Sequence, residues 1–193
     1  QEGHKVSIAS NKNNKILRIL DMIWAVAKNF QNTDVVLIDT FGAFNFYYAL
    51  VISQVCRFLK IPYIPILHGG NLPIRLKENP YFSKLIFSHA YKNVAPSNYL
   101  KSAFEDQGFL TELIPNVVEI KNYTFKQRKA YKPNILFVRA FHQIYNPTMA
   151  VRVLYKVLQK YPEASLCMIG PVKDASFQET KDLAEKLGIS KYS

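Results

Sequence analysis

Apolar runs of strand length recur along the chain and alternate with segments of helical periodicity, and this alternation limits the possible folds more than any other feature. Several runs carry almost no polar residue, which is typical of strands buried on both faces of a sheet. Strands of this kind joined by helices predict an α/β fold with a parallel sheet. The expected strands are residues 4–10 (HKVSIAS), 34–40 (DVVLIDT), 62–68 (PYIPILH), 92–96 (KNVAP), 111–115 (TELIP), 134–138 (NILFV) and 165–170 (SLCMIG).

Helix signals lie between these strands. Ser97 is expected to cap a helix that Gly108 ends, Asn146-Pro147 to open another, and Ser176 with Glu179 to form a capping box. The helices are expected near residues 16–27, 43–59, 80–90, 98–107, 147–161 and 176–187. The first should place one set of residues on a single face: Ile16, Ile19, Leu20, Ile23, Trp24 and Ala27. The helix after Ser97 should pack Tyr99, Leu100, Ala103 and Phe104 inward.

The strand-helix rhythm stops between Pro115 and Pro133 and then restarts. We therefore predict a Rossmann-like N-terminal domain over residues 1–115, a linker over 116–132 and the start of a second domain over 133–193. The linker carries Lys121, Lys126, Arg128, Lys129 and Lys132, and a solvated linker is favoured over a dedicated basic binding loop. Neither domain has a full set of elements: the first lacks an opening apolar strand with a glycine-rich turn, and the second stops after two strand-helix pairs. We expect both to be truncated parts of a longer chain.

The formal charge of +11 and a pI near 9.6 suggest an anionic partner. Nucleic acid, a membrane surface and phosphorylated small molecules are all candidates. The charge is spread evenly, with 12 Lys/Arg against 7 Asp/Glu up to residue 110 and 13 against 7 after it. Nucleic acid is not expected as a partner, because no basic-aromatic motif occurs.

The chemistry of the cysteines and histidines points to a chain without metal or disulfide. Cys56 and Cys167 each lie in an apolar run and are expected to be buried thiols in a reducing compartment. The four histidines lack metal-ligand spacing. The most apolar stretch, residues 43–59, is broken by polar residues, so we expect no membrane span and no signal peptide. A cytoplasmic location follows, although a basic chain can also sit on the anionic inner face of a membrane.

Ligands of open parallel sheets bind beyond the carboxyl ends of the strands, so those positions are where chemistry is expected. His68 stands there beside two glycines, although an ordinary hydrogen-bonding role is an alternative. Glycines at these ends suggest close backbone approach or positive φ. The positions are Asp39-Thr40-Phe41-Gly42, His68-Gly69-Gly70-Asn71, Ala95-Pro96-Ser97, Arg139 and Gly170-Pro171-Val172-Lys173.

Arg139 is the strongest single candidate for a ligand-binding residue. It follows a buried strand, and the helix start at Asn146-Pro147 should bring backbone N–H groups and partial positive charge near it. A guanidinium beside a helix N-terminus can hold a phosphate. The alternative is a structural arginine paired with a neighbouring acid. Two linked α/β units with such a site suggest a nucleotide-diphosphate compound as ligand.

At these residues the chain resembles the retaining glycosyltransferases of family 4, which have the GT-B fold. The segment NVAPSNYLKSAFEDQGFLTELIPNVVEI resembles the end of that family's N-terminal domain, with its Ser-opened helix and I-P-N tripeptide. ILHGG resembles the strand ending in His-Gly, and ILFVRAFHQIYNP with SLCMIGP resembles the opening of the second domain. The resemblance runs from about Val35 to Leu187.

The resemblance implies a metal-independent transfer, with retention, from a UDP- or GDP-sugar to a glycan or lipid-linked acceptor, as in polysaccharide biosynthesis. It implies that Arg139 stabilises the leaving diphosphate and that His68 reaches the transferred sugar. No cofactor is implied beyond the donor substrate. The other implied site residues are Gly170 and Pro171 for the donor, and Gly69 and Gly70 for the sugar pocket. From their places at the strand ends we add Gly42 and Asn71 to the acceptor and sugar pocket, and Lys173 as a stand-in for the family's second cation on the donor.

The chain also departs from the family pattern. A Lys-Gly pair usual after the arginine is replaced by IYNP, and Val138 stands where a glycine is common. The family's glutamate pair would lie beyond residue 193, so these residues by themselves are expected to be inactive or severely impaired. Two other hypotheses stay open: a non-catalytic nucleotide or phosphosugar-binding module, and a basic nucleic-acid or membrane-surface adaptor.

Overall fold

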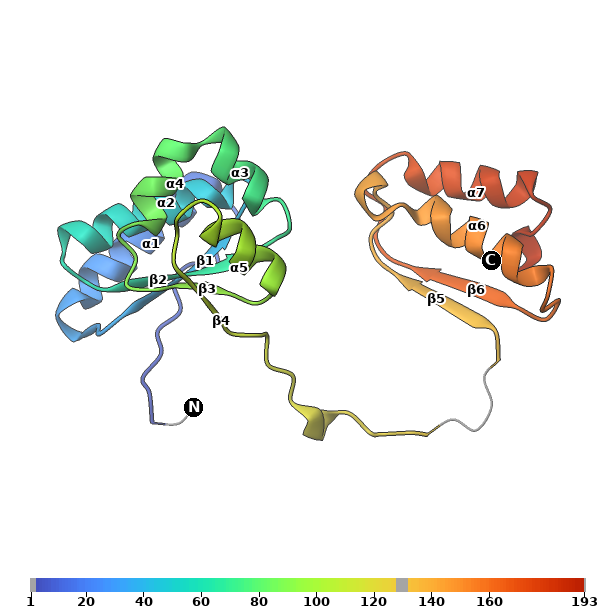
Figure 1. The fold of residues 1–193 in the computed structure, drawn as a ribbon, viewed down its shortest axis with the longest axis horizontal. Coiled ribbons are helices and arrows are strands. Elements are labelled where there is room, and N and C mark those ends of the chain that lie inside the picture. Colours follow the sequence, from blue (N-terminus) through green and yellow to red (C-terminus); the bar gives the residue numbers. More distant parts are fainter. Residues whose placement is uncertain (1–2, 128–131, 193) are drawn as a thin grey trace. The chain divides into compact units, whose positions relative to one another are not determined.

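The chain folds into two compact α/β units, shown in Figure 1. The computed structural model describes residues 3–127 and 132–192. Unit 1 comprises Gln1–Ile120 and unit 2 comprises Lys121–Ser193, so the division falls inside the segment predicted as a linker. Strands alternate with helices in both units and every strand pair is parallel, which confirms the predicted fold class.

Unit 1 is built on a four-stranded parallel sheet in the order β1-β2-β3-β4. The strands are β1 (Val36–Phe41), β2 (Tyr63–His68), β3 (Asn93–Ala95) and β4 (Thr111–Leu113). Each strand therefore pairs with the strand that follows it in the sequence. The register pairs Phe41 with His68, so β1 and β2 end together at one edge of the sheet.

Five helices accompany this sheet, and Figure 1 shows α2, α3 and α4 together over one of its faces. Their apolar sides bury a core that includes Phe46, Leu72, Ile86 and Phe104. Tyr63 is buried with them, its hydroxyl donates to the Ile86 carbonyl at 2.6 Å, and burial raises its pKa to about 12. The helices are α1 (Lys15–Asn29), α2 (Asn45–Phe58), α3 (Leu72–Glu78), α4 (Pro80–Phe87) and α5 (Asn98–Glu105), with short 3-10 turns at Phe30–Asn32 and Ile120–Asn122.

The N-terminal part of unit 1 differs from the sequence prediction. Residues 4–10 form no strand; Val6 and Ile8 are 65% and 95% exposed. An alternating pattern alone does not make a strand when no neighbouring strand is there to pair with it. The predicted apolar face of α1 is also divided: Ile23 packs against the core, while Trp24 is 64% exposed.

Unit 2 consists of a two-stranded parallel sheet with both of its α-helices on the same side (Figure 1). Val151, Leu154 and Leu166 form its buried centre. The elements are β5 (Asn134–Val138), a 3-10 turn at Gln143–Tyr145, α6 (Pro147–Leu158), β6 (Ser165–Ile169), α7 (Ser176–Lys186) and a 3-10 turn at Ser190–Tyr192.

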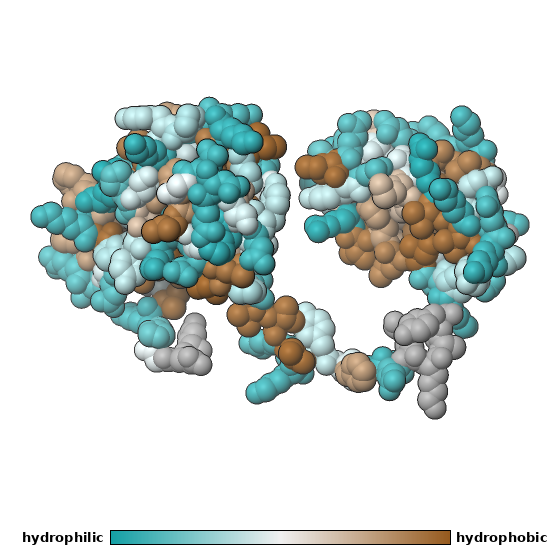
Figure 2. All heavy atoms as spheres, in the orientation of Figure 1, coloured by the Kyte–Doolittle hydropathy of each residue, from teal (hydrophilic) through white to brown (hydrophobic). Residues whose placement is uncertain are grey.

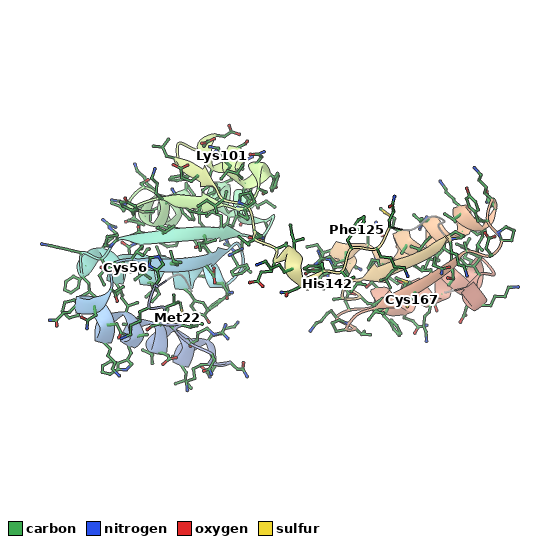
Figure 3. The ribbon with its side chains drawn as sticks, turned by 90° about the horizontal axis from the view of Figure 1, so that it is seen from below. Met22, Cys56, Lys101, Phe125, His142 and Cys167 are labelled. Atoms are coloured by element: carbon green, nitrogen blue, oxygen red, sulfur yellow. The ribbon has the colours of Figure 1, made fainter. Side chains whose placement is uncertain are left out.

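The sheet of unit 2 has one uncovered face, where Figure 2 shows hydrophobic residues gathered on the surface. Leu136 and Val138 are 62% and 60% exposed there. Cys167 points to the same face, so the prediction that it is buried is wrong, because alternate residues of β6 face opposite ways. Cys56 in α2 is buried as predicted, and burial raises its pKa to about 11; Figure 3 labels both thiols.

Three of the four predicted helix-end signals are confirmed: the cap at Ser97, the end at Gly108 and the start of α6 at Asn146-Pro147. Ser97 Oγ accepts a hydrogen bond from the Leu100 amide at 3.4 Å, and Gly108 has a φ of +81° just beyond α5. Asn146 precedes α6 but has a left-handed conformation, and its side chain accepts from Thr148 Oγ1 and not from a backbone amide.

The predicted capping box of Ser176 with Glu179 is wrong. Asp174 Oδ1 accepts from the Ser176 amide at 2.9 Å and so takes the role that the prediction gave to the serine. Ser176 lies inside α7, and its hydroxyl is buried. The error arose because two acceptors lie close together in the sequence and only the fold decides which one faces the helix start.

Candidate functional site

In unit 1 the predicted histidine is held by two neighbours at the carboxyl ends of β1 and β2. His68 Nε2 lies 3.1 Å from Asp39 Oδ1, and its ring stacks on Phe41 with centroids 5.0 Å apart and planes at 23°. The register places Phe41 beside His68 and Asp39 beside Ile66, so all three side chains share one face of the sheet. The His68 side chain is 27% exposed and that of Asp39 is 71% exposed. A histidine oriented by a carboxylate and still open to solvent can take or give a proton.

Asp39 was noted at a strand end but was not among the predicted site residues. Its link to His68 spans 29 residues of sequence and depends on which strands are neighbours. Once β1 and β2 are taken as adjacent parallel strands ending together, the two-residue spacing of Asp39 and Phe41 places both on the face that His68 occupies, and this supplies the missing signal.

Three of the four residues predicted to shape a sugar pocket meet where the loops after β1 and β2 lie against each other. A Cβ added at Gly42 would lie 2.5 Å from Asn71 Oδ1, and one added at Gly69 would lie 3.3 Å from the same atom. Gly69 also has a φ of +92°. The side chain of Asn71 therefore occupies the space that these two glycines leave, and the two loops can approach each other because neither glycine has a side chain.

Gly70, the fourth of these residues, faces open space. A Cβ built on it would meet nothing within 4 Å, and its carbonyl accepts a hydrogen bond from the Tyr99 hydroxyl at 3.1 Å. Tyr99 was expected to pack inward but is 61% exposed, because its hydroxyl reaches this loop from α5. Arg75 Nε donates to the Gly42 carbonyl at 2.9 Å and so ties α3 to the same region.

In unit 2 the predicted donor residues meet where β5 and β6 end. The Arg139 amide donates to the Ile169 carbonyl at 3.1 Å, which extends the ladder of the two strands by one step. A Cβ at Gly170 would lie only 1.9 Å from the Arg139 carbonyl oxygen. Gly170 is therefore required by the close approach of two backbones, whatever it does toward a ligand.

The loops beyond these strand ends are joined by backbone hydrogen bonds. The Phe141 amide donates to the Pro171 carbonyl at 2.9 Å, and the Lys173 amide donates to the Phe141 carbonyl at 3.0 Å. The predicted donor residues Gly170, Pro171 and Lys173 thus lie on a loop that is fixed to the segment following Arg139. The side chain of Lys173 is exposed beside it.

The Arg139 guanidinium is exposed and lies 5.1 Å from the centre of the Tyr145 ring. Among the described residues it has no ion pair with an acid, so the alternative of a structural arginine paired with a neighbouring carboxylate is not observed. The first turn of α6 carries no acidic residue either. The positive charge at this strand end is therefore open to an anion.

Asp174 organises the second loop of this region. Its carboxylate accepts from the amides of Ser176 and Gln143, at 2.9 and 2.8 Å, and hydrogen bonds from these residues hold its pKa below the usual value. His142 Nδ1 lies 3.7 Å from the same carboxylate. Asp174 thereby connects the loop after β5 to the start of α7, and both its oxygens are occupied by backbone donors.

The described residues contain neither a metal-binding cluster nor a membrane-spanning helix. In residues 3–127 and 132–192 no group of three or more His, Cys, Asp or Glu side chains is placed to hold a metal ion. Within the same ranges no helix has the length and apolar character needed to cross a bilayer.

Comparison with known proteins shows the fold and leaves the activity open. No model of a protein family matches the chain, and no protein of curated function matches it. Among solved structures, the chain is similar to a 2.2 Å crystal structure from Listeria monocytogenes of a protein assigned as a UDP-N-acetylglucosamine 2-epimerase, with a TM-score of 0.52 and 14% identity. The match covers 86% of this chain and 47% of that one, so the chain spans about half of its length. The likeness supports the predicted Rossmann-like units of the GT-B type.

Proposed function

We propose that the chain is part of an enzyme that uses a nucleotide-diphosphate sugar, and that it transfers the sugar with retention to a glycan or lipid-linked acceptor. The observation that carries the proposal is the exposed guanidinium of Arg139. It stands at the carboxyl end of a parallel strand, close in sequence to a helix start without acidic residues, and has no acidic partner among the described residues. A diphosphate leaving group needs a fixed positive charge of this kind. The structural neighbour is assigned as an epimerase of a UDP-sugar, which supports a nucleotide-diphosphate sugar as the ligand of this chain.

In this proposal the residues of unit 2 bind the donor. Arg139 holds the diphosphate, Lys173 supplies a second cation, and the loop at Gly170-Pro171 approaches the nucleoside. The residues of unit 1 act on the sugar and the acceptor: His68 contacts the transferred sugar. The two loops that carry Gly42, Gly69, Gly70 and Asn71 shape the space around it. Fixed cations can stabilise the departing diphosphate without a metal ion.

Calorimetry with UDP and GDP on the full-length protein tests the donor site. Binding of one nucleotide diphosphate is expected, and Arg139→Ala should weaken it by about ten- to a hundredfold, since hydrogen bonds to charged groups contribute roughly 1.5 to 3 kcal/mol. Arg152→Ala is the matched control, because Arg152 is also exposed and lies on α6. Absence of binding by the unaltered chain, or equal losses for the two variants, would contradict the proposal.

A second candidate is proton chemistry on the sugar of the same donor, as in the epimerisation named for the structural neighbour. The 3.1 Å pair of His68 and Asp39 favours it, because inverting a stereocentre by proton transfer requires a base that removes the proton from that carbon and an acid that returns a proton to its opposite face. Incubating the complete enzyme with UDP- and GDP-sugars in deuterated water separates the two reactions. Solvent deuterium in recovered nucleotide sugar indicates epimerisation, while acceptor-dependent release of UDP or GDP indicates transfer.

A further inference from the structure

The segment that follows β4 exposes large apolar side chains next to lysines. We call residues 114–126 the connecting segment; its one regular element is the 3-10 turn at Ile120–Asn122. Figure 2 shows hydrophobic and hydrophilic residues interspersed along it. Six large apolar side chains are exposed within these residues: Ile114 at 56%, Val117 at 88%, Val118 at 60%, Ile120 at 80%, Tyr123 at 68% and Phe125 at 87%.

This exposure is unusual because it is concentrated. Single exposed apolar residues are normal on protein surfaces, whereas a contiguous group generally marks a surface that contacts another molecule. The composition of these residues also differs from that of an ordinary flexible linker, which is rich in small and polar residues. The connecting segment therefore has the composition of a contact surface.

The charge around the connecting segment indicates the sign of its partner. Between Glu119 and Glu163 the sequence contains nine Lys and Arg residues and not one Asp or Glu. Lys121 and Lys126 belong to the connecting segment, and both are exposed. Arg128, Lys129 and Lys132 follow directly in the sequence. Apolar side chains alternating with cations fit a partner that offers both an apolar layer and a layer of negative charge.

We propose that the connecting segment docks the protein on an anionic lipid bilayer. Val117, Ile120 and Phe125 enter the boundary between head groups and acyl chains, while Lys121 and Lys126 bind lipid phosphates at the surface. Aliphatic side chains do not stack on bases, so a nucleic acid would leave most of the apolar group uncovered. The backbone of the segment stays at head-group depth, because an irregular chain needs water to satisfy its N–H and C=O groups. This inference stands independently of the nucleotide-sugar proposal.

Sedimentation with vesicles tests the docking directly. The full chain is mixed with vesicles of phosphatidylcholine alone or of phosphatidylcholine with phosphatidylglycerol, and the fraction bound is measured at low and high salt. Binding is expected only to the anionic vesicles and should weaken as salt rises. Replacing both Lys121 and Lys126 by Gln should lower the partition coefficient by roughly 30-fold, since each lysine near an anionic surface contributes roughly fivefold.

The apolar half of the proposal is tested by Phe125→Ser, which should lower the partition coefficient by about tenfold. Phe58→Ser is its matched control, because Phe58 is 86% exposed in α2 and lies outside the connecting segment. Lys77→Gln combined with Lys186→Gln is the control for charge, since both lysines are exposed on other helices. Neither control should reduce binding by more than about twofold.

Three results would overturn the proposal. The first is no binding to anionic vesicles. The second is equal loss from Phe125→Ser and Phe58→Ser, which would mean that the connecting segment is not the contact. The third is salt-sensitive binding to a labelled RNA that displaces the vesicles and is unchanged in Phe125→Ser, which would assign the basic surface to nucleic acid.

Discussion

Replacing Gly170 by Ala should destabilise unit 2, because the added Cβ has no space. It would lie 1.9 Å from the carbonyl oxygen of Arg139 and 2.5 Å from its carbonyl carbon. Ordinary van der Waals contact begins near 3.4 Å, so the two backbones must separate by about 1.5 Å. No side-chain rotation can relieve the overlap, since the atoms that collide belong to the main chain.

The cost follows from the hydrogen bonds that this separation breaks. The bond from the Arg139 amide to the Ile169 carbonyl, now 3.1 Å, would exceed 4 Å, and the bonds that join Phe141 to Pro171 and Lys173 would lengthen with it. Three bonds at about 1 kcal/mol each give a loss of about 3 kcal/mol. Because a small core supplies only about 3 to 5 kcal/mol, this is a large part of the stability of unit 2.

Hydrogen-deuterium exchange with mass spectrometry measures the effect within each unit. Peptides that contain β5 and β6 should lose protection by about a hundredfold, while peptides of unit 1 should not change. Gly70→Ala is the control, because a Cβ there meets nothing within 4 Å and neither Gly70 nor Gly170 has a positive φ. It should change stability by less than about 0.5 kcal/mol. Unchanged protection of β5 and β6 in Gly170→Ala would refute the close approach as the reason for this glycine.

Two further predictions concern the reactivity of the two free cysteines and the charge of Asp174. Cys167 should react with a thiol reagent at pH 8 in the folded chain, and Cys56 only after unfolding, because it is buried and its pKa is about 11; equal reaction rates would contradict this. The depressed pKa of Asp174 means that its carboxylate stabilises unit 2 above its unfolded pKa of about 3.9, and that this contribution is lost as the pH falls through the lower folded value. Thermal unfolding should therefore show Asp174→Asn less stable than the original chain at pH 7, with the gap closing toward pH 2; a gap independent of pH would refute the assignment.

Local patterns in the sequence determined the elements of the fold to a large extent. The nearly continuous apolar runs at β1, β2, β5 and β6 predicted strands that pair in parallel, and this is confirmed. The expectation that such strands are buried on both faces is wrong for β1, β5 and β6, because helices cover only one face there: Leu37 and Leu136 are 61% and 62% exposed. The cap at Ser97 and the positive φ at Gly108 were also predictable, since both depend on neighbours within a few residues. The strand predicted at residues 4–10 is wrong, because a local pattern cannot show whether a neighbouring strand is present to pair with it.

The tertiary structure alone decided how the candidate site is assembled. The contact between His68 and Asp39 depends on the register of two strands, and the burial of Cys56 against the exposure of Cys167 depends on which faces the helices cover. Gly170 could be predicted as a special position, but the carbonyl of Arg139 that requires it lies 31 residues away along the chain. Periodicity is a property of neighbouring residues and is written in the sequence, whereas contacts between distant strands arise only when the sheet has formed.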